Sequence, residues 1–334
     1  MNRFQYVRPN SAEEAVSLLG NDFSKVKILA GGLDLIGEMK QHLVEPETVV
    51  SISGLDELKT IQDDGDKIRI GAGVTLCEIA RHESIRKRYT ALAEAASQVG
   101  SPQIRHAGTL GGNLCQRPRC WYYRDETYSC LKKGGRLCYS ITGRNQYHAI
   151  LGGGPCFMIH PSDCAPALIA LAATIRLLGP ESSREMPLEN FFVLPTQDYR
   201  RENVIKPDEI LTEVQIPDTG MRSTFIKFRE KESFDWALSS VAIALKLEGT
   251  FCEEARIVLG GVAPAPWRLQ KVEEILRGKE ITESIARQAS DAAVEGAFPL
   301  KENEGKIPLT KTLVKRAIMK IKAEPSSVGS SWLY

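Results

Sequence analysis

Two glycine-rich segments carry residue types that suit the binding of a phosphorylated cofactor. The first is Ile28-Leu29-Ala30-Gly31-Gly32-Leu33-Asp34-Leu35, and the second contains Thr109-Leu110-Gly111-Gly112-Asn113. Glycine has no Cβ, so backbone N–H groups in such a turn can approach a phosphate closely. Either segment alone could be an ordinary link between a strand and a helix. Two of them in one chain can bind the two ends of one dinucleotide.

A group of cysteines lies after the second glycine turn and forms the other chemical signal. Its members are Cys120, Cys130, Cys138 and Cys156. In a chain without features of secretion, such a group indicates metal or iron–sulfur ligation rather than disulfides. Four thiolates are the number that a [4Fe–4S] cluster needs. A structural zinc site typically takes its cysteines from two closely spaced pairs, which are missing here. On spacing alone, zinc and unrelated core cysteines stay open as alternatives.

Composition excludes several functional classes. The chain has 334 residues, 43% hydrophobic and 25% charged residues, and a formal net charge of +1. This charge balance gives no reason to expect a nucleic-acid or anionic-membrane partner. No signal-peptide pattern opens the chain, and no apolar run approaches about twenty residues. We therefore expect a cytoplasmic protein without a membrane span, although export together with a signal-bearing partner stays open.

The first two thirds of the chain predict alternating strands and helices around these motifs. Strands are expected at 26–30 and 48–52 on either side of the first glycine turn, which gives a βαβ-like unit. Capping boxes at Ser11/Glu14 and Thr75/Glu78 predict two helix starts. Further elements are expected as a strand at 68–70, a helix at 91–99, a helix from 166 that ends as a strand at 174–178, and a strand at 209–216.

The last third of the chain predicts a different arrangement of strands and helices. Strand-like runs at 223–229, 239–247 and 255–262 are followed by helical segments near 269–276, 283–294 and 310–321. Strands followed by helices are typical of a separate α+β domain. The turn Pro217-Asp218-Thr219-Gly220 is the candidate boundary.

The two glycine motifs, together with Ser162-Asp163 and Gly260-Gly261-Val262-Ala263-Pro264, resemble the FAD-binding subunit of the xanthine dehydrogenase family of molybdenum hydroxylases. The resemblance covers essentially the whole chain. It implies an α+β fold with a two-part FAD-binding domain at 1–219, divided at about 1–55 and 56–219. A CO dehydrogenase flavoprotein-type C-terminal domain would occupy 220–323, and an extended tail would occupy 324–334.

The same resemblance assigns roles to the motif residues. Residues 28–35 would hold the pyrophosphate of FAD, and Thr109 to Asn113 would hold the phosphate and flavin region. Asp163 would contact the ribityl or ribose hydroxyls, and Lys227 would approach the flavin ring. Leu33 departs from the family pattern, which usually has a small hydroxyl residue there, so backbone donors would have to replace one side-chain hydrogen bond.

The cysteines indicate a smaller group of proteins within the family that this chain resembles. Their segment, at about 115–157, is similar to an insert in the β subunit of 4-hydroxybenzoyl-CoA reductase and in the flavin subunit of periplasmic aldehyde oxidoreductase. That insert carries an extra [4Fe–4S] cluster, which implies Cys120, Cys130, Cys138 and Cys156 as ligands. Cys77, Cys115, Cys164 and Cys252 are expected to be bystanders.

Weaker candidates have ordinary explanations. His106 and His160 flank the motifs, but a lone histidine is more often a structural hydrogen-bonding group. The insert is also basic, which fits a solvated loop, charge compensation for an anionic cluster, or a docking surface for an acidic ferredoxin.

The resulting hypothesis is an oxidoreductase subunit that transfers electrons through FAD and a [4Fe–4S] cluster. Its partners would be a molybdopterin-binding large subunit, a [2Fe–2S] small subunit, and ferredoxin or NAD(P) as an external carrier. No catalytic residue is expected in this chain. The alternatives are a stand-alone FAD oxidoreductase with a structural metal site formed by the four cysteines, and a non-enzymatic assembly module.

Overall fold

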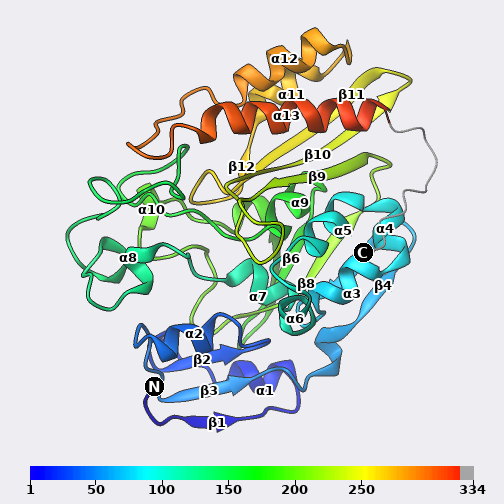
Figure 1. Ribbon diagram of the computed structural model, residues 1–334. Helices are drawn as coiled ribbons and strands as arrows, with labels where there is room; N and C mark the ends of the chain where they lie inside the picture. Colours follow the sequence, from blue (N-terminus) through cyan, green and yellow to red (C-terminus); the bar gives the residue numbers. More distant parts are fainter. Residues whose placement is uncertain (324–334) are drawn as a thin grey trace.

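Three β-sheets follow one another along the molecule in the computed structural model, which describes residues 1–323 (Figure 1). The first belongs to an N-terminal unit, the second lies in the middle, and the third lies at the far end beneath the last helices. The predicted tail at 324–334 lies outside the described residues. The mixed helix and sheet content confirms the predicted α+β fold class.

The N-terminal unit is a small parallel sheet in the order β1-β3-β2. Its elements are β1 (Gln5–Val7), α1 (Ala12–Ser17), β2 (Val26–Leu29), α2 (Leu35–Lys40) and β3 (Thr48–Ser51). Since β2 and β3 run parallel and α2 connects them, the predicted βαβ unit is confirmed. The first glycine turn links β2 to α2. Ser11 caps α1 by accepting a hydrogen bond from the Glu14 N–H, but the Glu14 carboxylate bonds Asn10, so the capping box is only half formed.

The middle sheet is antiparallel, in the order β4-β5-β8-β6-β7. Its strands are β4 (Ile61–Asp63), β5 (Lys67–Gly71), β6 (Thr174–Leu178), β7 (Ser183–Pro187) and β8 (Ile210–Pro217). The helices of this region are α3 (Leu76–Arg81), α4 (Glu83–Arg88), α5 (Thr90–Ser97), α6 (Pro102–Ala107), α7 (Leu110–Cys115), α9 (Cys164–Ala170) and α10 (Pro195–Asp198), with the 3₁₀ turns η1 (Asp56–Lys59) and η3 (Leu188–Asn190). The predicted capping box at Thr75 and Glu78 is fully formed at the start of α3.

The cysteine-rich segment between α7 and α9 has little regular structure. It contains only the short helix α8 (Trp121–Arg124) and the 3₁₀ turn η2 (Leu131–Lys133). Figure 1 shows it as a set of loops at the side of the molecule, next to α10 and above α2. Its path is therefore fixed by side-chain contacts with neighbouring segments rather than by the regular backbone hydrogen bonds of a helix or a sheet.

The third sheet separates two hydrophobic cores. Its strands are β9 (Arg222–Phe228), β10 (Ser239–Glu248), β11 (Phe251–Gly260), β12 (Trp267–Arg268) and β13 (Lys279–Glu280), in the order β12-β11-β10-β9 with β13 on β11. Val241, Ile243 and Leu245 of β10 face α11 (Gln270–Leu276), α12 (Glu283–Ala292) and α13 (Lys306–Ala323), whereas Ala242 and Ala244 face the core that contains α5 and α9. This alternation follows from the two-residue period of a strand.

No helix within residues 1–323 is long and apolar enough to cross a lipid bilayer.

Candidate cofactor site

A large cavity lies where the N-terminal unit meets the middle of the molecule. Its volume is about 680 Å³. Pockets for drug-sized ligands typically hold about 300–1,000 Å³, so this cavity has the size of a ligand-binding site. Its lining comes from β2 and the first glycine turn, from the second glycine turn at the start of α7, and from the segment that joins α10 to β8.

The two glycine turns are in direct contact at one edge of this cavity. A Cβ added to Gly31 would collide with the carbonyl oxygen of Ala107, so only glycine lets the two turns come this close. Gly32 has a φ of +76°, the left-handed region that favours glycine. In the second turn, the Thr109 hydroxyl accepts a hydrogen bond from the Gly112 N–H at 3.2 Å and begins α7. The turns thus leave backbone facing the cavity where side chains would otherwise fill it.

Most of the motif residues predicted from the sequence line this cavity. They are Ile28, Leu29, Ala30, Gly31, Gly32, Leu33, Asp34, Leu35, Thr109, Gly111, Gly112 and Asn113. Leu110 is the exception in the glycine turns, because its side chain is fully buried in the core between the middle sheet and α9.

Asp163 and Lys227 pair with each other and are not among the residues that line the cavity. The Lys227 Nζ lies 2.6 Å from the Asp163 carboxylate, and both side chains are almost completely buried. Burial raises the pKa of Asp163, against the opposing effect of the Lys227 ammonium. Next to them, the Ser162 hydroxyl donates to the Asn113 side-chain oxygen at 2.5 Å, which ties the Ser162-Asp163 segment to the second glycine turn.

Several cavity residues were not predicted from the sequence. They are cationic or aromatic and include Lys27, Arg117, Arg119, Arg200, Arg201, Phe23, Phe234 and Trp236. The Arg119 guanidinium lies 4.8 Å from the centre of the Trp236 ring. Its buried Nε has no hydrogen-bond partner among the described residues. Cations next to exposed backbone N–H groups suit an anionic pyrophosphate, so the residues present fit a cofactor of the FAD type. Only Arg117 and Arg119, a few residues after the second turn, could have been suspected from the sequence.

The four predicted cysteine ligands surround a second, smaller cavity. Cys120, Cys130, Cys138 and Cys156 all line it, and its volume is about 10 Å³. The other lining residues are Tyr122, Tyr123, Leu131, Lys132, Tyr139 and Met158. Cys115 lines the large cavity instead, while Cys164 is fully buried in the core. The structure therefore separates the four predicted cysteines from both of these neighbours.

Two of the thiols around the small cavity are in direct contact, because Cys138 and Cys156 form a hydrogen bond with each other. Within residues 1–323, no group of three or more His, Cys, Asp or Glu side chains is arranged to hold a metal ion. The Cys120 thiol contacts the His148 ring at 3.3 Å, and the Cys138 thiol contacts the Ser140 hydroxyl at 3.1 Å. Burial raises the pKa of Cys120 to about 11. The fold thus brings the four predicted ligands to one cavity, but this geometry alone does not support the predicted cluster.

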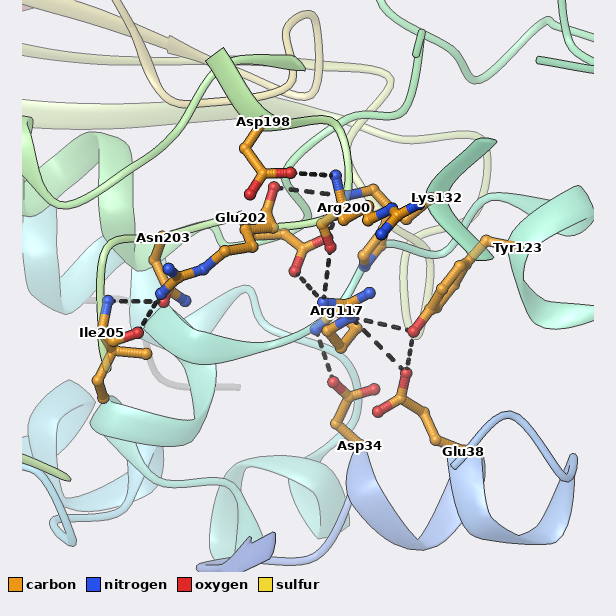
Figure 2. A network of polar contacts seen from close by, with 12 residues as sticks. Asp34, Glu38, Arg117, Tyr123, Lys132, Asp198, Arg200, Glu202, Asn203 and Ile205 are labelled. Atoms are coloured by element: carbon orange, nitrogen blue, oxygen red, sulfur yellow. Dashed lines mark hydrogen bonds and ion pairs between the residues drawn. The ribbon is translucent and has the colours of Figure 1, made fainter. Parts of the chain in front are cut away.

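Charged and polar residues from the linings of the two cavities form one network of contacts, here called the wall (Figure 2). Asp34 accepts a hydrogen bond from the Arg117 N–H at 2.7 Å, and it pairs with Arg119 at 2.9 Å and Arg124 at 2.6 Å. In this way the carboxylate of the first glycine turn anchors the start of the cysteine-rich segment.

The same wall contains two further carboxylates. Glu202, in the segment after α10, pairs with Arg117 at 2.6 Å and with Lys132 at 2.5 Å. Glu38 of α2 accepts a hydrogen bond from the Tyr123 hydroxyl at 2.5 Å. Glu38, Arg117 and Glu202 line the large cavity, and Tyr123 and Lys132 line the small one. The two cavities are therefore separated by a single layer of paired side chains.

Comparison with known proteins gives matches over the whole chain. Residues 2–219 match the FAD binding domain in molybdopterin dehydrogenase, and residues 212–324 match the CO dehydrogenase flavoprotein C-terminal domain. The aldehyde oxidoreductase FAD-binding subunit PaoB of Escherichia coli (strain K12) is 31% identical and covers 97% of this chain and 100% of the relative. The carbon monoxide dehydrogenase medium chain of Hydrogenophaga pseudoflava is 29% identical, over 95% of this chain and 96% of the relative.

Solved structures agree with these matches. A carbon monoxide dehydrogenase from Hydrogenophaga pseudoflava, in a form that lacks the Mo-pyranopterin moiety, superposes with a TM-score of 0.76 at 27% identity, covering 95% of this chain and 96% of that chain. The sequence matches, the shared fold and the paired glycine turns together show that this chain belongs to the FAD-binding medium subunits of the molybdenum hydroxylase family.

Proposed function

We propose that this chain is an electron-transfer subunit that holds one FAD and one [4Fe–4S] cluster within a molybdenum hydroxylase-type complex. The observation that carries the proposal is the pair of neighbouring cavities with one shared wall, the first lined by both glycine turns and the second by four cysteines. FAD supplies the ability to exchange one or two electrons, which joins a two-electron reaction to one-electron carriers.

The glycine turns would position the flavin cofactor. Residues 28–35 would hold its pyrophosphate by backbone N–H groups, and Thr109 to Asn113 would hold the phosphate and flavin region. Asp163 would bind the ribityl or ribose hydroxyls, with Lys227 at the ring. Asp163 and Lys227 pair with each other, and the hydrogen bond between Ser162 and Asn113 connects this pair to the second glycine turn. Both residues would therefore contact the cofactor from behind that turn.

The four cysteines of the small cavity would bind the cluster. In a zinc site, four sulfurs lie about 2.3 Å from a single ion. In a [4Fe–4S] cluster, each thiolate binds a different iron, so the sulfurs stand apart around a bulky centre. The four cysteines that line one cavity supply the number of thiolates that such a cluster needs.

The proposed domain boundaries follow the elements of the fold. The FAD-binding domain would end at residue 219, in the turn between β8 and β9. Its two parts would divide near residue 55, after β3, and the insert would span about 115–157. Residues 220–323 would form the C-terminal domain.

The partners would be a molybdopterin-binding large subunit and a [2Fe–2S] small subunit, with ferredoxin or NAD(P) as the external carrier. Substrate chemistry would take place on the large subunit. Of the two candidate types of complex, the aldehyde oxidoreductase type has the support of the full-length Escherichia coli relative. The 4-hydroxybenzoyl-CoA reductase type is the alternative.

Purification of the native complex tests this proposal. We expect the chain to co-purify with a larger molybdenum-containing chain and a smaller [2Fe–2S] chain. The complex should oxidise aldehydes, and activity on an aromatic coenzyme A thioester instead would assign the other type. Isolation of this chain as a monomer that converts an organic substrate unaided would overturn the proposal.

A further inference from the structure

The carboxylates in the wall between the cavities differ in how well their charge is compensated (Figure 2). Asp34 has two guanidinium partners, Arg119 and Arg124, within 3 Å. Glu202 has two cations as well, because Arg117 and Lys132 each pair with a different one of its oxygens. Both carboxylates therefore have two close cationic partners.

Glu38 lacks such a partner. Its one ion pair within residues 1–323 is with the Arg117 Nε at 3.9 Å, and that guanidinium already pairs with Glu202 at 2.6 Å. Its short contact is instead with a neutral group, the Tyr123 hydroxyl at 2.5 Å. The Glu38 side chain is also buried, with 5% of the residue exposed. Glu38 is thus the carboxylate of the wall whose charge has the weakest compensation by cations.

The charged and titratable groups around Glu38 come from four elements. Asp34 lies at the start of the same helix, and Lys27 comes from β2. Arg117, Arg119, Tyr123 and Arg124 come from the cysteine-rich segment, and Glu202 lies beyond Arg117. Burial is the main reason that the pKa of Glu38 is raised, and the negative charge of Asp34 acts in the same direction. The Tyr123 hydroxyl, Arg117 and Arg124 oppose this shift without cancelling it.

Glu38 also lies where it can respond to both cavities. Its carboxylate lines the large cavity, from which water can deliver a proton, and the phenol that it binds lines the cysteine cavity. Charges interact strongly across a buried layer of this kind, because little water screens them. A negative charge added in the cysteine cavity therefore favours the protonated form of Glu38.

We propose that Glu38 is a proton-binding site that takes up one proton when one electron enters the cysteine cavity. The inference rests on the proposed iron–sulfur site. The electron comes from an external one-electron reductant and resides on the cluster, while a proton from cavity water converts the Glu38 carboxylate to a carboxylic acid. One electron and one proton arrive together, so the net charge around the wall stays constant. Tyr123 is a positioning residue that keeps its own proton throughout.

Redox titration of the cluster at several pH values tests this inference. The purified holoprotein is reduced stepwise with dithionite while the iron–sulfur absorbance is followed. In the wild type, the midpoint potential should fall as the pH rises, because each tenfold drop in proton concentration opposes proton uptake. For one proton per electron the slope approaches about 59 mV per pH unit. Glu38→Gln has no titrating group at this position, so its potential should be nearly independent of pH.

Two further variants keep the result interpretable. Tyr123→Phe removes the hydrogen bond that stabilises the ionised carboxylate, so the pH-dependent range should move to higher pH. Glu209→Gln is the matched control, since Glu209 is also buried and lines the same cavity but pairs with Arg184 at 2.8 Å. It should keep the wild-type slope.

The possible results distinguish a failure of this inference from a failure of the proposed function. A cluster potential that is independent of pH in the wild type, or a wild-type slope retained in Glu38→Gln, would overturn the role of Glu38 and leave the cofactor assignment intact. If Glu38→Gln fails to fold, an unchanged pH profile in Tyr123→Phe would overturn it equally. A holoprotein without iron–sulfur absorbance would overturn the proposed function and this inference with it.

Discussion

At the scale of single residues, Gly31 shows how closely the two glycine turns depend on each other. A side chain at this position would collide with the Ala107 carbonyl and separate the turns that line the large cavity. We predict that Gly31→Val weakens FAD binding by roughly 5- to 150-fold, because overpacking of this kind costs about 1–3 kcal/mol. Titration of the flavin-free protein with FAD measures the effect.

Gly37→Ala is the matched control for this prediction. Gly37 lies in α2, six residues further on, and a Cβ there meets no atom within 4 Å. Alanine should therefore stabilise the helix by roughly 0.5–1 kcal/mol and leave FAD affinity unchanged. Equal affinities in Gly31→Val and the wild type would show that the turns do not form the binding site.

Cys115 and Cys120 give the sharpest test of the cysteine assignment. They are five positions apart in the sequence, yet Cys115 lines the large cavity and Cys120 lines the small one. We predict that Cys120→Ser lowers the iron content and that Cys115→Ser keeps it, with FAD largely bound in both. Iron analysis and the visible spectrum measure the difference. Loss of iron in Cys115→Ser, with all iron retained in Cys120→Ser, would reverse the assignment.

Some of these residues could be predicted from the sequence, and others could not. The glycine turns and the cysteines have local patterns, so their place at two cavities could be anticipated. The role of Asp34 in the wall could not, because the Arg117 N–H that it binds is 83 residues away. Glu38 and Glu202 carry no motif at all, and only the folded chain brings them beside the cysteine-rich segment.

At the scale of elements, local signals predicted most strands and long helices. The helix–strand junction of α9 and β6 and the strand–helix order of the C-terminal domain agree with the predictions. Helix α7 was missed, because its glycines favoured an irregular turn. It forms because the Thr109 side chain caps it and Gly111 packs against Ala72, where a Cβ would not fit. The wall also depends on such short elements, since α2 and α8 supply Glu38 and Tyr123.

Helix α13 attaches the C-terminal domain to the cysteine-rich segment through its first residue. Lys306 is buried, and its Nζ donates to the carbonyl oxygens of His148 and Gly261 at 3.0 and 2.8 Å. Burial lowers the pKa of Lys306 to about 7, below the ordinary value of about 10.4. Between these pH values the unfolded chain binds a proton that the folded chain lacks, so the free energy of unfolding rises with pH.

We predict that Lys306→Met loses this part of the pH dependence. The wild type should gain stability between about pH 7 and pH 10 relative to the variant, by up to tenfold in the unfolding equilibrium per pH unit. Urea denaturation at several pH values measures it. Lys311→Met, which removes a more exposed lysine of the same helix, should follow the wild type. Parallel profiles for Lys306→Met and the wild type would contradict the prediction.

At the scale of the whole molecule, the fold places two cavities side by side. The N-terminal unit and the middle region line the first, and the cysteine-rich segment lines the second. Figure 2 shows ion pairs among residues of the two linings. The glycine turns of the first cavity and the cysteines of the second were predicted from the sequence, but the wall between the cavities was not. Contacts between segments so distant in the chain leave no periodic pattern in the sequence.

Flavin and metal analysis of the anaerobically purified protein tests the two-cofactor proposal most directly. We predict one FAD per chain, released by acid precipitation, together with about four irons and matching acid-labile sulfide. Bound flavin accompanied by one zinc per chain and no iron would contradict the proposal, and would assign the four cysteines to a structural metal site instead.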